Sequence, residues 1–263
     1  MKDTPHRHLP EIDGLRALAV CLVVLFHAGV SGFSNGYVGV DLFFVISGYV
    51  ICSMIERAIA AGTFEFLNFY ERRARRLFPA LLVLLVVLTV VGWLILLPSD
   101  LVTFAKAELA GLSFLANVFF WRRSGYFAEQ ASLNPLLHLW SLGIEEQFYV
   151  AFPILFVVTR KRLSVHLHWV LPVMTLLLFA AACSSAPALS DFYSPLSRAW
   201  EFLLGASVAV SRLRQPRLGW REACAALGLA TILVFSSSFA GRAPWTVFPY
   251  ILAPPRPRKP YVA

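Results

Sequence analysis

The chain has 263 residues, of which 58% are hydrophobic and 14% are charged, and its mean hydropathy is +0.68. Ordinary soluble domains are about 45 to 50% apolar and about 25% charged, so the composition excludes a typical soluble domain and indicates an integral membrane protein. The formal net charge is +8, but the cations gather in short segments between apolar runs, as they do in cytoplasmic loops. We therefore expect no nucleic acid partner.

Apolar runs recur along the chain, and a run of about 20 residues is long enough to cross a bilayer as a helix. Residues 1–13 are polar and carry Lys2 and Arg7, which places the N-terminus in the cytoplasm by the positive-inside rule. The fold class that we predict is all-α, a polytopic transmembrane helix bundle of about seven spans plus one interfacial or re-entrant segment. The expected spans cover residues 14–31, 38–55, 80–97, 138–158, 168–184, 198–210 and 223–239.

The interfacial or re-entrant segment is 103–121, which is apolar enough to cross but contains charged side chains. The argument is parity, because the arginine-rich segments 57–76 and 160–162 both indicate the cytoplasmic side. Two segments on the same side must be separated by an even number of spans. The two clear spans between them already meet this condition, so 103–121 is not expected to cross. The alternative treats Arg122 and Arg123 as part of an inner loop, which would invert every later span.

The four cysteines form neither a C-x-x-C pair nor a mixed cluster with histidine, so neither a zinc site nor a disulfide framework is expected. The sequence also lacks the glycine patterns of nucleotide-binding loops and the G-x-S-x-G elbow of serine hydrolases. We expect no metal and no permanently bound cofactor.

Two polar residues stand out in the first apolar segment. Arg16 and His27 are eleven residues apart, so on a helix they face the same way, about 16 Å apart along the axis. Charged or polar side chains in a span are costly and usually face a bundle interior or a wet cavity, where they mark a functional site. The alternative is an interface anchor plus a core histidine that donates to a helix carbonyl.

Four motifs follow one another along the chain. The first joins DGLR at 13–16 to His27 and then to GVDLFFVISG at 39–48. The others are FYERRARRLFP at 69–79, HLWSLGIEEQFY at 138–149 and RAWEFLLG at 198–205. In content and order these motifs resemble the membrane-bound acyltransferase-3 family, which includes the O-antigen and peptidoglycan O-acetylases. The similarity extends over about residues 8–250.

The resemblance implies an enzyme that moves an acyl group, acetyl in the O-acetylases, from cytosolic coenzyme A to a hydroxyl of a cell-surface or lipid-linked glycan. It implies a multi-pass protein of the bacterial inner membrane whose partners are the lipid bilayer, acyl-CoA as donor substrate and the glycan acceptor. Residues 1–252 would form the acyltransferase domain and 253–263 a Pro/Arg-rich tail. Because family members have about three further spans, we expect the domain to be incomplete at its C-terminal end.

Acyl transfer to a hydroxyl needs a base for the hydroxyl proton and a site for the acyl carrier. His27 is the best candidate base, since histidine changes protonation near neutral pH. Arg16, which forms the functional signature with His27 in the family, is expected to bind an anionic donor or to hold the carboxylate of Asp13. Asp41, just inside the second span, is expected to pair with His27 across the outer turn.

Arg73 and Arg76 are three residues apart, so they are neighbours on one helix face. Guanidinium groups suit phosphate oxygens, and the cytoplasmic segment that carries both arginines is where coenzyme A would present its phosphates. The alternative is that inner-loop arginines serve only topology and anionic lipid.

A second polar stripe is expected in the span that begins at His138. His138 and Glu145 fall within about 20° of one helix face, with Ser141 between them and Tyr149 one turn further on. We expect His138 and Glu145 to orient the acceptor or His27, so the catalytic candidates are these two residues with His27 and Arg16.

Three further residues complete the candidate site. Arg198 and Glu201 are expected to form an internal ion pair within the sixth span. Ser47 is a supporting candidate, although its motif is not that of an activated serine nucleophile.

Two other functions remain open at this stage. Buried Arg, His and Glu side chains also line the paths of transporters and channels, and a truncated chain could be a catalytically inactive partner. The enzyme is favoured by the arginine pair beside the helix of Arg16 and His27, and by the lack of two matched interrupted spans in the sequence.

Overall fold

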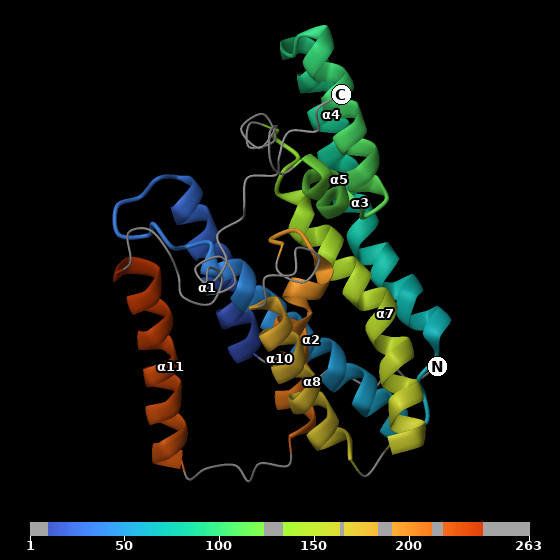
Figure 1. Cartoon of the computed structure of the whole chain (residues 1–263), viewed down its shortest axis with the longest axis vertical. Helices are drawn as coiled ribbons and strands as arrows, with labels where there is room; N and C mark the ends of the chain where they lie inside the picture. Colours follow the sequence, from blue (N-terminus) through green and yellow to red (C-terminus); the bar gives the residue numbers. More distant parts are fainter. Residues whose placement is uncertain (1–9, 124–133, 164–165, 184–190, 212–217, 239–263) are drawn as a thin grey trace.

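The computed structural model describes residues 10–123, 134–163, 166–183, 191–211 and 218–238, so the expected tail at 253–263 lies outside the described residues. All regular secondary structure in these ranges is α-helical (Figure 1), which confirms the predicted fold class. The helices are α1 (Pro10–His27), α2 (Val38–Ala60), α3 (Phe66–Ile95), α4 (Pro98–Leu112), α5 (Ala116–Arg123), α7 (Leu139–Leu163), α8 (Leu167–Ala182), α10 (Pro195–Val210) and α11 (Leu218–Ser238).

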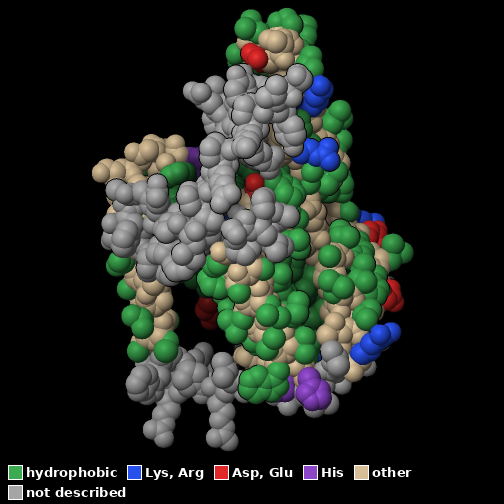
Figure 2. All heavy atoms as spheres, viewed as in Figure 1, with side chains coloured by type: hydrophobic (Ala, Val, Ile, Leu, Met, Phe, Trp, Pro, Cys, Tyr) green, Lys and Arg blue, Asp and Glu red, His purple; other side chains and the backbone are tan. Residues whose placement is uncertain are grey.

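Among the described residues, three helical segments are long and apolar enough to cross a membrane by length and composition, namely Val38–Ala60, Phe66–Ile95 and Leu139–Arg160. Shorter apolar helices cover Leu167–Ala182 and Glu222–Val234. Many valine and leucine side chains of α3 are exposed, as expected for a helix that faces lipid, and apolar side chains predominate on the described part of the face in Figure 2. The number of seven spans stays a prediction.

The centre of the bundle is the close contact of α2 with α10. A Cβ atom added at Gly48 would collide with the carbonyl oxygen of Phe202 in α10, and one added at Gly205 would collide with the carbonyl oxygen of Val45 in α2. Glycine at both positions therefore lets the two backbones touch, as small residues do between membrane helices. The ring of Phe202 stacks on Phe44, with ring centroids 4.5 Å apart.

Two contacts between distant segments set the direction of α7. The ring of His27, at the end of α1, lies against the ring of His138, just before α7. At the other end of the bundle, Arg160 of α7 forms an ion pair with Glu56 near the end of α2. Helices α2 and α7 therefore run in the same direction, and α7 starts on the side where α1 ends.

This arrangement supports the predicted parity. Helix α3 begins after α2, on the side of Arg160, and must end on the side of His27, where α7 begins. Between them, the apolar segment 103–121 is not one continuous helix, because it breaks between α4 and α5 at Phe114, whose φ is 56°. With 15 and 8 residues, both helices are shorter than the roughly 20 residues that a span requires.

Partly buried polar contacts hold this break in place. The side-chain amide of Gln147 in α7 donates to the carbonyl oxygen of Phe114 at 2.8 Å and to Oδ1 of Asn117 at 2.8 Å. Asn117 in turn donates to the carbonyl oxygen of Tyr193 at 3.1 Å. The backbone group that the break leaves unpaired is thus satisfied from α7, which non-helical backbone inside a membrane domain requires.

Candidate active site

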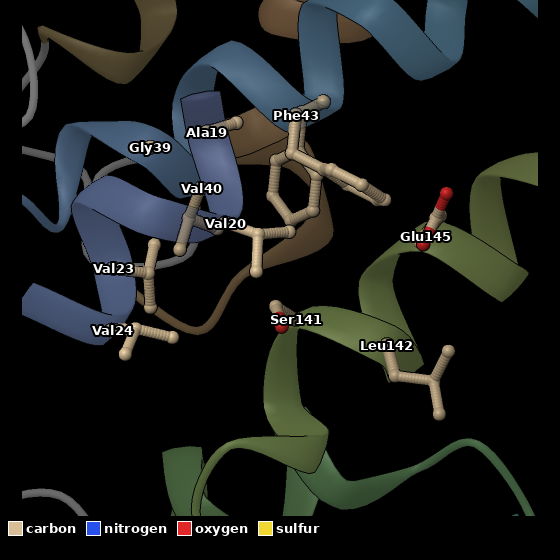
Figure 3. A pocket seen from close by; sticks show the side chains of 11 residues that line it. Ala19, Val20, Val23, Val24, Gly39, Val40, Phe43, Ser141, Leu142 and Glu145 are labelled. Carbon is tan, nitrogen blue, oxygen red and sulfur yellow. The ribbon is translucent and has the colours of Figure 1, made fainter. Parts of the chain in front are cut away.

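A pocket of about 320 Å³ lies between α1, α2 and α7 (Figure 3). Its walls are mostly aliphatic and aromatic, and the polar side chains among its lining residues are Ser141 and Glu145 of α7. The α1 side of the pocket consists of Ala19, Val20, Val23 and Val24. These four residues lie between Arg16 and His27 in α1, so the pocket runs along the stretch of helix that separates the two predicted functional residues.

His27 is exposed and is the last residue of α1. Its Nδ1 lies 2.8 Å from the carbonyl oxygen of Val23. A carbonyl oxygen only accepts, so Nδ1 carries the proton of this bond and the neutral ring keeps its lone pair on Nε2. This is the bond that the purely structural alternative expects, but it leaves Nε2 available as a base. The His27 and His138 ring centroids are 4.6 Å apart at an interplanar angle of 90°.

The expected pairing of Asp41 with His27 is wrong. Oδ1 of Asp41 accepts from the guanidinium of Arg198 at 2.9 Å, and the same nitrogen of Arg198 also lies 2.9 Å from Oε1 of Glu201. The predicted ion pair between Arg198 and Glu201 is therefore confirmed, with Asp41 as a third member. All three residues are buried, so a nearby guanidinium is a far stronger partner for the Asp41 carboxylate than the exposed ring of His27.

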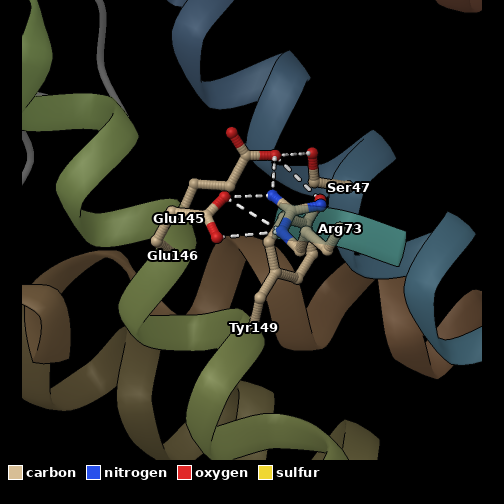
Figure 4. A network of polar contacts seen from close by, with 5 residues as sticks. All are labelled: Ser47, Arg73, Glu145, Glu146 and Tyr149. Carbon is tan, nitrogen blue, oxygen red and sulfur yellow. Dashed lines mark hydrogen bonds and ion pairs between the residues drawn. The ribbon is translucent and has the colours of Figure 1, made fainter. Parts of the chain in front are cut away.

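Arg73 and Arg76 point to different environments rather than forming one phosphate clamp. Nε of Arg73 donates to both carboxylate oxygens of Glu146 at 2.9 Å, and its guanidinium carbon lies 3.3 Å from the ring centroid of Tyr149 (Figure 4). Arg76 is exposed. One arginine of this segment, Arg73, therefore lies within the bundle, where its positive charge faces the buried carboxylate of Glu146.

Glu146 is the site residue that the sequence analysis did not identify as the partner of Arg73. It lies directly after Glu145, and both are buried. A pair of carboxylates inside a membrane span needs a nearby cation, and that requirement is the signal by which Arg73 could have been assigned to the bundle interior.

Glu145 joins three of the predicted residues into one network. Its Oε1 accepts hydrogen bonds from the hydroxyl groups of Ser47 and Tyr149, each at 2.8 Å, and the guanidinium of Arg73 lies 3.8 Å from the same oxygen. His138 directly precedes the first residue of α7, and it takes no part in the hydrogen bonds of this network. The structure therefore places His138 with His27 and Glu145 with Ser47.

Arg16 precedes the pocket-lining residues of α1, and His27 follows them. Its guanidinium carbon is 5.8 Å from the ring centroid of Phe43, which lines the pocket. Its Nε is buried and has no hydrogen-bond partner among the described residues. Asp13, the proposed partner of Arg16, is exposed. Within the same ranges, no group of three or more His, Cys, Asp or Glu side chains is placed to hold a metal ion.

The chain belongs to an acyltransferase family, since residues 9–254 match the family model described as "Acyltransferase domain". It is 33% identical over 225 residues to "Putative peptidoglycan O-acetyltransferase YrhL" of Bacillus subtilis (strain 168), a match that covers 80% of this chain and 34% of that protein. It is 41% identical over 150 residues to "O-acetyltransferase OatA" of Staphylococcus aureus (strain NCTC 8325 / PS 47), covering 56% of this chain and 24% of OatA.

The chain thus spans about a third or less of the length of these relatives. No solved structure is significantly similar to it. The family confirms the resemblance that the four motifs carry, while the roles of individual residues are taken up below as proposals.

Proposed function

We propose that this chain is the acyl-transferring membrane part of an O-acetyltransferase. It takes an acetyl group from coenzyme A on the cytoplasmic side and delivers it to a hydroxyl of a cell-surface or lipid-linked glycan, in a bacterial inner membrane with the N-terminus in the cytoplasm. The observation that carries the proposal is the apolar pocket along α1 between Arg16 and His27. The names of the relatives support acetyl as the group and peptidoglycan as the kind of acceptor.

The distance between Arg16 and His27 along α1 matches the length of the pantetheine arm of the proposed donor. Arg16 and His27 are about 16 Å apart along α1. In coenzyme A, 14 bonds separate the acyl carbonyl carbon from the phosphorus at the end of the pantetheine arm, which is about 16 Å when extended at the rise of an extended chain. A donor with its thioester at His27 therefore brings its phosphate to Arg16, whose Nε lacks a partner among the described residues.

The chemistry requires one proton shuttle. Nε2 of His27 takes the proton of the acceptor hydroxyl while that oxygen attacks the thioester carbonyl carbon. The new C–O bond forms, the C–S bond breaks, and the leaving thiolate takes the proton back from His27. No net proton or electron is consumed. His138 lies beside His27 and is placed to orient the ring or the acceptor.

Two arginines of α3, Arg73 and Arg76, are proposed to have different roles. Arg76 is exposed on the cytoplasmic part of α3 and is proposed to contact the nucleotide phosphates of the donor. Arg73 would have to leave Glu146 to join it, so in the arrangement described here we propose that Arg73 holds the network around Glu145.

Thiol release from acetyl-CoA tests the proposal. The purified chain in proteoliposomes is expected to release coenzyme A faster when a glycan acceptor is present, with acetyl appearing on the glycan. A transporter or an inactive partner would give no acetylated glycan. The absence of acetyl transfer by well-inserted protein would overturn the proposed activity for this chain.

A further inference from the structure

The carboxylate of Glu145, a residue that lines the pocket, has one oxygen that is bonded and one that has no partner among the described residues. Oε1 accepts from Ser47 and Tyr149, and all dashed contacts of Glu145 in Figure 4 end on that oxygen. Oε2 forms no hydrogen bond with a described residue. It is also not fully buried, so a ligand can reach it. Since Glu145 lines the pocket (Figure 3) and its Oε1 is already bonded, Oε2 is the hydrogen-bond acceptor that Glu145 can offer to a ligand in the apolar slot.

The depth of Glu145 is set by α7. His27 and His138 lie at the same level, and Glu145 is seven residues after His138, which is about 10 Å further towards the cytoplasmic end. A carboxylate at this depth is too far from His27 to share the reacting carbonyl group with it. It is placed instead to meet a group of the donor about 10 Å from the thioester.

We infer that Glu145 binds the inner amide of the donor's pantetheine arm, the N–H that lies nearer the phosphate. The inference rests on the proposed thioester donor. In pantetheine, eight bonds separate this nitrogen from the acyl carbonyl carbon, or about 9 Å when extended. An amide N–H is the complement of a carboxylate oxygen that lacks a donor, and in an otherwise apolar slot the amide needs such a partner because a buried unpaired polar group is costly.

The network behind Glu145 gives it a fixed direction. Ser47 and Tyr149 donate to Oε1 from α2 and from one turn along α7, and the Arg73 guanidinium lies 3.8 Å from it. These contacts prevent the carboxylate from turning its used oxygen into the pocket. Ser47, Tyr149 and Arg73 are therefore positioning residues for the acceptor that Glu145 presents.

A glutamine at position 145 tests this role. In Glu145→Gln, the side-chain oxygen keeps the two hydroxyl bonds, so the NH₂ group faces the pocket and a donor replaces the acceptor. Two donors are compared, acetyl-pantetheine and S-acetyl-N-acetylcysteamine, which ends before the inner amide. The wild type is expected to favour acetyl-pantetheine about 10- to 100-fold in kcat/KM, as for a hydrogen bond to a charged group, and Glu145→Gln is expected to lose this preference.

Glu146→Gln is the matched control, because it changes the neighbouring carboxylate, which contacts Arg73 and is not among the pocket-lining residues. It is expected to keep the wild-type preference even if both rates fall. A donor with an ester oxygen in place of the inner N–H gives the same test in the wild type, where it should be no better than the short donor. This measurement holds even if a variant fails to fold.

Three results would overturn the inference. These are a wild type that does not discriminate between the two donors, a Glu145→Gln variant with the wild-type preference, and equal slowing of both donors by that variant. If the wild type moves no acetyl group from acetyl-CoA to a glycan, the proposed function fails as well, and this outcome is distinct from the other three.

Discussion

The imidazole rings of His27 and His138 lie edge to face, with centroids 4.6 Å apart. This contact joins the end of α1 to the start of α7 and thereby brings together two motifs that are far apart in the sequence. The predictions that follow depend on this arrangement.

Replacing His27 with alanine should abolish acetyl transfer and leave membrane insertion intact. A positioned base contributes about 100- to 10,000-fold to the rate, whereas one exposed side chain at a helix end contributes little to insertion. The measurements are acetylated glycan formed per minute and the amount of protein in the membrane fraction. Normal transfer by well-inserted His27→Ala would refute the proposed mechanism.

Replacing Arg76 with alanine should raise the KM for acetyl-CoA and leave the KM for acetyl-pantetheine unchanged. The reason is that only acetyl-CoA carries the nucleotide phosphates that Arg76 is proposed to contact. Arg162→Ala removes another exposed cation of the arginine-rich segments and serves as the control. If both variants raise the KM for acetyl-CoA equally, the arginines act only through the charge of the surface.

Replacing Arg73 with glutamine should destabilise the protein by about 3 to 5 kcal/mol, because it leaves buried carboxylates without their cation. The double variant Arg73→Gln with Glu146→Gln should recover much of this loss, since it removes one carboxylate together with the guanidinium. Thermal unfolding in detergent measures both. Equal melting temperatures for the single and double variants would show that the loss does not come from the uncompensated carboxylate of Glu146.

A methyl group at Gly48 should disrupt the contact of α2 with α10. The added Cβ meets main-chain atoms of Phe202, which cannot move aside as a side chain can. Overpacking typically costs about 1 to 3 kcal/mol, and we expect the loss of folding stability to be at least this large. Gly228→Ala in α11 is the control, since a Cβ there has no neighbour within 4 Å. It should stabilise its helix by about 0.5 to 1 kcal/mol.

The side of the membrane on which α7 begins can be read by labelling single cysteines in a cysteine-free background. An impermeant thiol reagent added from outside should label cysteines at Ser31 and Asn134 and should not label one at Thr63. Ser31 follows α1, Asn134 precedes α7, and Thr63 joins α2 to α3. Protection at Asn134 with labelling at Ser31 would contradict the parity of the fold.

Local spacing allowed the sequence to predict contacts within one helix. Arg198 and Glu201 are three residues apart, and on any helix they are neighbours, so their ion pair could be anticipated. Asp41 could not be assigned to the same cluster, because its approach to Arg198 depends on the packing of α2 against α10. The sequence placed Asp41 near His27 by proximity along the chain, which is a weaker guide than burial.

The arginine-rich segment shows a second limit. Counting cations predicts which side of the membrane a segment favours, but it does not say where each guanidinium points. Arg73 turns inward because two buried glutamates need a cation. The adjacent glutamates indicate this need in the sequence, but which arginine meets it depends on how α3 packs beside α7. The break at Phe114 could not be predicted from the sequence for a similar reason, since the side chain that bonds to its carbonyl oxygen, Gln147, lies in another helix.

The bond from His27 to the carbonyl oxygen of Val23 has a consequence for how the base can vary. Its acceptor is a main-chain atom, so the identity of the side chain at position 23 does not decide which ring nitrogen is protonated. The tautomer is set by the helix backbone. His27 therefore needs no acidic neighbour, and the carboxylate of Asp41 is left to stabilise Arg198 elsewhere in the bundle.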